Sequence, residues 1–390
     1  MLETVDQFKA VDLLERWYHK YNHPVIDLVG MVGTGKQQII EDFIDRIGFE
    51  KYQVMYLSHN QADIMNLAEQ QYHAYYINGI LYDYYKDINF DTLKIINPSS
   101  FEVLFKWKKN RKKKINKNYK LIVVLNAELC SMKDINDLIK FGLPIILVSD
   151  PLTVAFEKSY LRQHDPNIFI DMILPSLKKD PIMHFIQKIL NQEVLPYGNF
   201  KSVNILKKKD SNIYNFKFSD IIITEHENSA KAINDLYRKK ILKNNTNILK
   251  NGERLIIAED SHTSIVNDVE EKIEFFLDRG VTGTVELVDS HISNRKYIDI
   301  TFKPDFYDES IPELCVDRFY LNDFKNRSIQ FACGNIYKFN YAYAIPVQLS
   351  QYGRWNDLTI IEEPYDDFNY HRRVLYTAIT RAKKSITIIR

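Results

Sequence analysis

The chain has 390 residues, of which 45% are hydrophobic, and this length predicts roughly two to four globular domains with several cores. Its 52 basic and 51 acidic side chains give a formal net charge of +1, so overall charge is excluded as the source of any attraction to nucleic acid. Three scattered cysteines exclude a disulfide framework and a cysteine-based zinc site, and the sequence has neither a signal-like N-terminus nor a long apolar stretch, which indicates a cytoplasmic protein without a membrane segment.

The first part of the chain alternates apolar runs with helical periodicity. "VDQFKAVDLLERWYHKY" has helical spacing, "HPVIDLVG" is typical of a buried parallel strand, and the helical "KQQIIEDFIDRIG" follows a glycine loop. Further strands are predicted in "YQVMYLS", "YKLIVVLNA" and "LPIILVSDP", with helical segments between them. This alternation predicts a parallel sheet covered by helices on both faces, in a domain over residues 1–175.

A basic segment interrupts this first domain at about 83–118. Nine of the fifteen residues from Lys106 to Lys120 are basic, which excludes a core strand and predicts a projecting arm. Its aromatic residues, among them Trp107, can stack on bases while the lysines hold phosphates, so the arm is a candidate surface for single-stranded DNA. The lysines expected to contact DNA are Lys112, Lys113 and Lys114. The alternative is a solvated charged face without a partner.

A second α/β domain is expected over residues 176–390, because the alternating pattern resumes at "DIIITEHENSAKAINDLYRKKIL". Within it, about 249–330 shows short β-like runs separated by glycine turns, which predicts a small inserted antiparallel barrel. The chain returns to the α/β pattern and ends in "VLYTAITRAKKSITIIR".

A phosphate-binding loop is predicted between the first strand and its helix. Gly30, Gly33, Thr34, Gly35 and Lys36 fit the pattern G-x-x-x-x-G-K in the strand-loop-helix context that this motif needs. The glycines let backbone N–H groups converge on phosphate oxygens, and the lysine reaches the outer phosphates. A glycine turn with a solvent-exposed lysine is the alternative.

The end of the chain, "VLYTAITRAKKSITII", resembles motif VI of superfamily 1 helicases, in which the arginine matching Arg381 reaches the γ-phosphate across a domain cleft. "TVDQFKA" resembles the adenine-reading Q motif with Gln7, and "YLSHNQAD" resembles motif Ia with Asn60. "YAYAIPVQLSQYGRW" resembles motif V, with Ser350 and Gln351 retained. Further segments match in order over essentially the whole chain, and they are most similar to the phage Dda/RecD type with a UvrD-like C-terminal domain.

This resemblance implies an α/β fold with two RecA-like parallel-sheet domains of the P-loop NTPase type, carrying the arm and the small SH3-like barrel as insertions. It also implies ATP and Mg²⁺ as cofactors, single-stranded DNA as a partner through residues such as Asn60, Ser350 and Gln351, and movement from 5′ to 3′. Replication or recombination proteins are further possible partners.

The sequence departs from this family where the chemistry takes place. Gln37 stands where a Ser or Thr should bind Mg²⁺. Motif II reads "LIVVLNAELCSM", and alignment on "SM" puts Glu128 at the metal carboxylate and Leu129 at the general base. Alignment on the strand end puts Asn126 and Ala127 there instead, which removes both functions. Any Mg²⁺ would therefore be held weakly, by Gln37 and Glu128.

Motif III keeps one of its two functional side chains. It reads "SDPLTV", in which Asp150 remains and Thr153 replaces the glutamine that senses the γ-phosphate. Lys178 or Lys179 replaces an arginine that contacts phosphate, which keeps the charge and loses the bidentate geometry. Motif V has also lost its Thr, His and Lys.

These changes predict a helicase-like protein that binds single-stranded DNA and has a weakened or inactive ATP-hydrolysis site, in phage or mobile-element replication or recombination. Because Lys36 and Arg381 remain, nucleotide binding without hydrolysis is compatible with the sequence. The alternative is an active ATP-dependent 5′–3′ helicase in which Glu128 serves the reaction.

Overall fold

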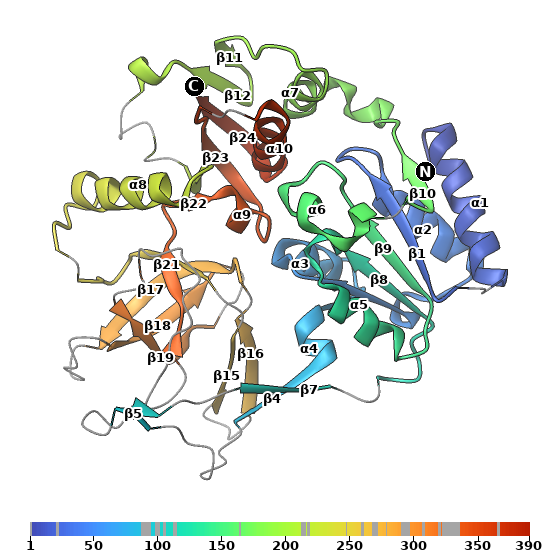
Figure 1. The fold of residues 1–390 in the computed structure, drawn as a ribbon, viewed down its shortest axis with the longest axis horizontal. Coiled ribbons are helices and arrows are strands. Elements are labelled where there is room, and N and C mark those ends of the chain that lie inside the picture. Colours follow the sequence, from blue (N-terminus) through green and yellow to red (C-terminus); the bar gives the residue numbers. More distant parts are fainter. Residues whose placement is uncertain are drawn as a thin grey trace.

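The computed structural model describes residues 2–20, 23–86, 95–97, 102–103, 107–111, 115–163, 165–211, 216, 219–246, 248–258, 261–266, 272–277, 279–289, 297–305, 309–318, 321, 336–364 and 367–390. Two parallel sheets and one smaller antiparallel sheet organise this part of the chain (Figure 1).

The first sheet has six parallel strands in the order β10-β1-β9-β8-β2-β3. Its central strands are continuous apolar runs, as expected for strands buried on both faces. The P-loop strand β1 is separated from β8 by β9. The strands are β1 (Val25–Gly30), β2 (Val54–Ser58), β3 (His73–Tyr76), β8 (Leu121–Leu125), β9 (Ile145–Ser149) and β10 (Ile168–Ile170).

Helices cover both faces of this sheet. Because successive side chains of a strand point to opposite faces, Val123 of β8 packs with Phe43 on one face and Val124 packs with Leu138 on the other. The helices of this domain are α1 (Val5–Lys20), α2 (Lys36–Ile47), α3 (Gln61–Glu69), α4 (Ile77–Leu81), α5 (Met132–Ile139) and α6 (Val154–Lys158).

The second sheet has the order β11-β12-β24-β23-β13-β22 and is parallel except for β11. One face packs against α7 and α10 and the other against α8, through residues such as Ile186, Tyr376 and Ala230. Its elements are β11 (Gly198–Phe200), β12 (Val203–Leu206), β13 (Ile221–Thr224), β22 (Ala344–Pro346), β23 (Trp355–Ile361), β24 (Ala382–Ile389), α7 (Pro181–Leu190), α8 (Glu227–Lys240), α9 (Val347–Ser350) and α10 (Phe368–Ile379).

The third sheet is a small barrel in the order β20-β19-β18-β17-β14-β21, which is antiparallel except for the parallel pair β19-β20. Its edge strands β20 and β21 are consecutive in the chain, so the stretch Ile336–Tyr341 pairs with both ends of the sheet and closes it. The sheet thus extends past the expected boundary near residue 330. Its strands are β14 (Arg254–Ile257), β17 (Thr282–Asp289), β18 (Tyr297–Pro304), β19 (Ile311–Asp317), β20 (Ile336–Tyr337) and β21 (Phe339–Tyr341), beside a hairpin of β15 (Ser261–Val266) and β16 (Lys272–Leu277).

The basic segment contains two antiparallel pairs, β4 (Tyr82–Lys86) with β7 (Trp107–Arg111) and β5 (Ile95–Asn97) with β6 (Glu102–Val103). Both pairs are separate from the two parallel sheets. The lysines at 112–114 lie outside the described residues. No helix in the described part of the chain is long and apolar enough to cross a membrane.

Candidate nucleotide site and nucleic-acid cleft

The P-loop connects β1 to the start of α2. Gly33 and Gly35 have φ values of 79° and 76°, the left-handed region that glycine adopts without strain. The Thr34 hydroxyl donates to the Met31 carbonyl at 2.7 Å and holds the turn together. The loop therefore has the backbone shape that directs N–H groups toward a phosphate.

Lys36 is folded back onto this loop. Its Nζ donates to the carbonyl oxygens of Gly30 at 2.5 Å and Met31 at 2.8 Å. Burial lowers the pKa of Lys36 below its ordinary value, while the nearby carboxylates of Asp150 and Glu128 act in the opposite direction. A ligand phosphate has to draw this ammonium group away from two carbonyl groups.

The two glutamines expected at the nucleotide site have other partners. Gln7 is fully buried, its Oε1 accepts from the backbone N–H of Glu3 at 2.7 Å, and its Nε2 donates to Gln38 at 3.1 Å. A Cβ atom placed on Gly35 would lie 2.1 Å from Gln7 Nε2, so this amide lies directly against the P-loop.

Gln37 is directed away from the P-loop. Its Nε2 donates to Glu41 Oε1 at 2.9 Å on the exposed side of α2. No group of three or more His, Cys, Asp or Glu residues suited to a metal ion occurs within the described ranges. Gln37 therefore does not direct its amide oxygen toward the P-loop, where a Mg²⁺ ligand would be expected.

Motif II begins with an asparagine. β8 ends at Leu125, and Asn126 follows in the left-handed conformation with φ of 49°. Its Nδ2 donates to Asp63 Oδ2 at 2.5 Å and lies 3.4 Å from Ser58 Oγ. The residue at the strand end is thus a hydrogen-bond donor to a carboxylate, the reverse of a metal-binding acid.

Glu128 faces the site from the short 3₁₀ turn Ala127–Leu129. Its side chain is buried, its Oε1 accepts from the Thr153 hydroxyl at 3.4 Å, and its Oε2 has no hydrogen-bond partner among the described residues. Burial, and after it the Asp150 carboxylate, raise the pKa of Glu128 to about 7, against the opposing effect of Lys36 and Arg381. The 3₁₀ turn therefore places a buried carboxyl group near Lys36 and Arg381, whereas the strand end itself carries the amide of Asn126.

Motif III lies at the end of β9. Asp150 accepts from the Leu152 amide at 3.0 Å through Oδ1, and Thr153 caps α6 by accepting from the Phe156 amide at 3.3 Å. Threonine at this position therefore has a structural role. Lys178 and Lys179 lie in the 3₁₀ turn Pro175–Lys179 with exposed side chains, while Leu177 of that turn approaches Gly33.

Arg381 comes from the second domain and is 6% exposed. It donates to Thr380 Oγ1 at 3.0 Å and to the carbonyl of Gln351 at 3.3 Å. Burial lowers the pKa of this guanidinium and Arg354 adds to the shift, while Asp63, Asp150 and Glu128 raise it. Lys36 and Arg381 therefore share the acidic neighbours Glu128 and Asp150 at the boundary between the domains.

Tyr376, which lies on α10 shortly before Arg381 in the chain, connects the domains directly. Its hydroxyl accepts from the Val32 amide of the P-loop at 2.8 Å and donates to Asp150 Oδ2 at 2.5 Å. Thr377 accepts from the Val154 amide at 3.0 Å. The first amide groups of α6, which have no partner within the helix, are thus satisfied from the second domain.

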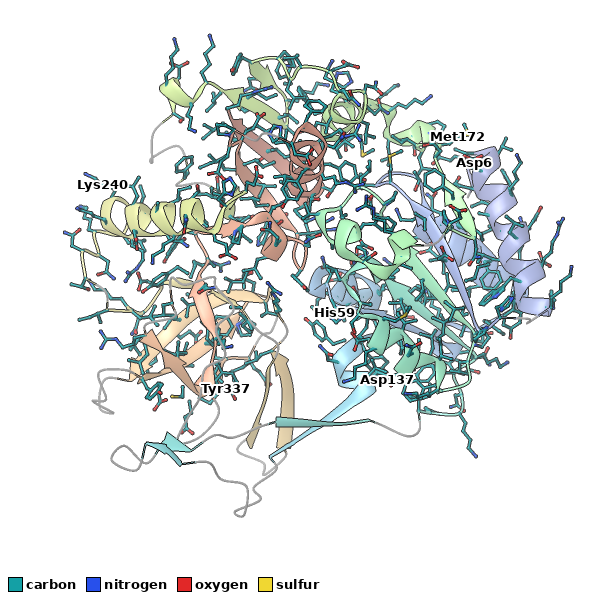
Figure 2. The ribbon with its side chains drawn as sticks, in the orientation of Figure 1. Asp6, His59, Asp137, Met172, Lys240 and Tyr337 are labelled. Carbon is teal, nitrogen blue, oxygen red and sulfur yellow. The ribbon has the colours of Figure 1, made fainter. Side chains whose placement is uncertain are left out.

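The residues expected to bind DNA in motifs Ia and V are buried at the same boundary. Asn60 donates to the Gln351 carbonyl at 3.1 Å, Gln351 accepts from the Ala155 amide at 2.9 Å, and Ser350 donates to Val347 at 2.7 Å. Figure 2 shows His59, the neighbour of Asn60, on the side of the first domain that faces the rest of the chain. DNA contact through Asn60 or Gln351 therefore requires these domains to separate.

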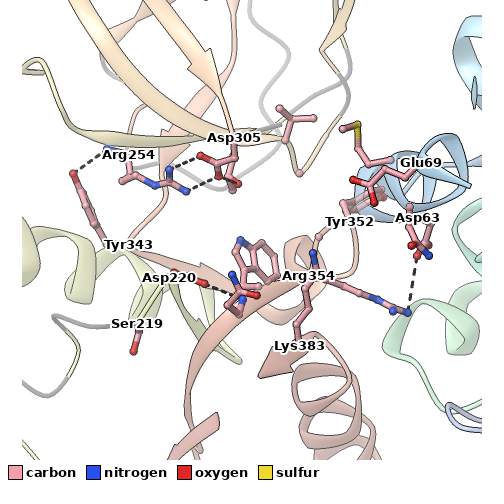
Figure 3. A pocket seen from close by; sticks show the side chains of 18 of the residues that line it. Asp63, Glu69, Ser219, Asp220, Arg254, Asp305, Tyr343, Tyr352, Arg354 and Lys383 are labelled. Atoms are coloured by element: carbon pink, nitrogen blue, oxygen red, sulfur yellow. Dashed lines mark hydrogen bonds and ion pairs between the residues drawn. The ribbon is translucent and has the colours of Figure 1, made fainter. Parts of the chain in front are cut away.

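A cleft of about 1010 Å³ lies beside this boundary, lined by α3, the loop after α9 and the barrel (Figure 3). Arg254 is paired with Asp305 at 2.5 Å across the barrel. Arg354 lies 4.0 Å from Asp63, the residue that also holds Asn126. Tyr352 and the exposed Lys383 line the cleft as well.

Sequence reasoning singled out Arg381 but missed Tyr376, Asp63 and Arg354. All three lie inside the quoted motif segments, "VLYTAITRAKK", "YLSHNQAD" and "QYGRW". The motifs that contain these residues were identified from the sequence. Their roles were not, because their hydrogen-bond partners lie far away in the chain, as Val32 does from Tyr376.

The strand order, the registers and the P-loop geometry decide the fold. The chain consists of two RecA-like domains. Searches against protein-family profiles and curated protein sequences find no match.

Among solved structures, the chain is similar to a Pif1 helicase from a study of forked double-stranded DNA, with 11% identity, coverage of 100% of this chain and 92% of that chain, and a TM-score of 0.49. It is similar to Pif1 from Candida albicans with 10% identity, coverage of 100% and 95%, and a TM-score of 0.45. It is similar to Bacteroides Pif1 bound to single-stranded DNA with 12% identity, coverage of 100% of this chain and 92% of that chain, and a TM-score of 0.46. At such low identity the likeness concerns the fold at most.

Proposed function

We propose that this chain is a superfamily 1 helicase-like protein of the Dda/RecD type that binds single-stranded DNA and has a weakened or inactive ATP-hydrolysis site. The observation that carries the proposal is the mixed state of the boundary between the domains. Lys36 and Arg381 have the same acidic neighbours, Glu128 and Asp150, so two cations from different domains lie near the P-loop, while Asn126 occupies the motif II strand end and bonds to Asp63.

Slow hydrolysis follows from the missing groups. Phosphoryl transfer depends on a metal ion that neutralises developing charge and on a base that orients water. Gln37 is directed toward Glu41, and Leu129 has no group that can accept a proton. A missing general base alone costs on the order of 10²–10⁴-fold in rate.

Nucleotide binding is supported by the loop that remains. Gly33 and Gly35 keep the backbone geometry for a phosphate, and Lys36 lies next to it. We therefore propose ATP or ADP as a ligand, with Mg²⁺ bound weakly if at all.

Binding of single-stranded DNA is supported by the cleft and by the composition of the arm. Within the cleft, Asp63 and Asp305 offset Arg354 and Arg254, so net charge gives little affinity there. The Tyr352 ring offers stacking instead, which is tolerant of sequence. The lysines of the arm are the expected source of phosphate contacts.

A place in phage or mobile-element replication or recombination, with protein partners from those processes, is an inference from the motif resemblance alone. From this role we expect the protein to act on DNA intermediates that have exposed single strands.

The alternative, an active 5′–3′ translocase, is favoured by one observation. Glu128 faces the site with a pKa raised to about 7, a value that suits a general base at neutral pH.

A steady-state ATPase assay with single-stranded DNA separates the two. We expect a rate near background, unchanged by Lys36→Ala, together with DNA binding that is retained. A DNA-stimulated rate of several turnovers per second that Lys36→Ala abolishes would establish the active translocase instead.

A further inference from the structure

We propose that the Tyr376 hydroxyl competes with a nucleotide phosphate for the P-loop, so that nucleotide binding requires the two RecA-like domains to separate at this contact. The proposal rests on the nucleotide-binding part of the proposed function and adds its regulation.

The hydroxyl occupies a phosphate-like position on the loop. Its oxygen accepts from the Val32 amide of the P-loop at 2.8 Å, and the hydroxyl donates to Asp150 Oδ2 at 2.5 Å. Tyr376 is fully buried, and burial followed by Asp150 raises its pKa well above the ordinary value. The group is therefore a neutral phenol with a fixed hydrogen-bond direction.

The rest of the loop is also covered. A Cβ atom on Gly33 would lie 2.5 Å from the methyl group of Met183 in α7, so the second domain is packed against the loop. Val32 packs against the hydrophobic core of that domain. Lys36 is occupied by the loop's own carbonyl oxygens. An incoming phosphate finds the loop closed by side chains of the same chain.

Side chains of the second domain form hydrogen bonds with the first domain across the boundary. Thr377 and Gln351 accept from the first amides of α6, and Arg373 donates to the Pro151 carbonyl at 2.7 Å. Because a buried polar group is costly when it is unpaired, these hydrogen bonds stabilise the closed boundary, while Glu128 Oε2 has no partner among the described residues. A charged phosphate forms stronger hydrogen bonds than a phenol and can displace it.

The decisive variant is Tyr376→Phe, with Tyr370→Phe as the matched control. Both remove one hydroxyl from α10, and the Tyr370 hydroxyl accepts from Gln348 Nε2 at 3.2 Å, away from the P-loop. Affinity is measured by titration with a fluorescent ATP analogue, with and without Mg²⁺. We expect Tyr376→Phe to bind about tenfold more tightly than the parent, the factor for one ordinary hydrogen bond, and the control to match the parent.

Equal or weaker binding by Tyr376→Phe, with a parent that binds, overturns the competition and leaves the proposed function intact. Absence of binding in the parent and in both variants overturns both.

Discussion

Asn126 Nδ2 donates to Asp63 Oδ2 at 2.5 Å, and this bond joins the end of the motif II strand to the helix that lines the cleft. Asp63 in turn lies 4.0 Å from Arg354 of the motif V loop. An aspartate at 126 would face another carboxylate, so the asparagine and its partner form a matched pair. The position has become a structural link between the nucleotide site and the cleft.

Replacing Asn126 by Asp should therefore destabilise the protein although it restores the expected motif residue. The variant loses a hydrogen bond and gains a like-charge contact with Asp63, which costs about 2–3 kcal/mol in the free energy of unfolding. Urea denaturation near neutral pH measures this difference.

The paired variant Asn126→Asp with Asp63→Asn is the control, because it exchanges the two partners and keeps a donor opposite a carboxylate. Its free energy of unfolding should lie closer to the parent than that of the single variant. A paired variant as unstable as the sum of both single changes would show that the contact has no energetic role.

Glu128 makes stability depend on pH. Its pKa in the folded state is raised to about 7 from the ordinary 4.5, so the folded state holds the proton longer than the unfolded state. The stability from this group is complete below pH 4.5 and is lost as pH rises to about 7. As pH rises from 4.5 to about 7, the parent loses this stability and Glu128→Gln does not. We therefore expect the free energy of unfolding of Glu128→Gln to exceed that of the parent by up to about 3 kcal/mol at the upper end of this range.

Urea unfolding of both proteins at several pH values between 4.5 and 8 tests this. Burial followed by Glu363 also raises the pKa of Glu225 to about 7, so Glu225→Gln should show a separate change of the same sign. Parallel pH profiles of the parent and Glu128→Gln would show that Glu128 is not desolvated.

The cleft is tested by reversing one charge. Lys383→Glu should weaken binding of single-stranded DNA by about 3- to 10-fold, since a phosphate contact is replaced by a repulsion. Lys384→Glu is the matched control, because Lys384 is the exposed next residue of β24 and does not line the cleft. Fluorescence anisotropy with a labelled oligonucleotide measures both, and equal losses would place the DNA elsewhere.

The arm is tested by the triple replacement of Lys112, Lys113 and Lys114 with Ala. Each lost phosphate contact should reduce the slope of log affinity against log salt by about 0.7 for a single strand. Affinity measured between low and moderate salt gives this slope. If the triple variant has the same slope as the parent, the three lysines do not contact DNA and the basic segment is a solvated charged face.

The sequence predicted the two parallel sheets because apolar strand-like runs alternate with helical segments and the P-loop marks the first βα unit. It left the motif II alignment open, because both alignments satisfy the local pattern. Only the left-handed Asn126 and the 3₁₀ turn after it show how Glu128 reaches the site. The contact between Tyr376 and Val32 could not be predicted from the sequence. The two residues are 344 positions apart, and nothing in either motif indicates that they meet.

The stretch that closes the barrel continues almost directly into motif V. Two residues, Ala342 and Tyr343, separate β21 from β22, and Gln351 follows α9. Tyr343 accepts from the Arg254 amide of the barrel at 3.0 Å. Because so few residues lie between the barrel and motif V, a shift of the barrel would be transmitted to the Gln351 carbonyl, to which both Asn60 and Arg381 donate hydrogen bonds.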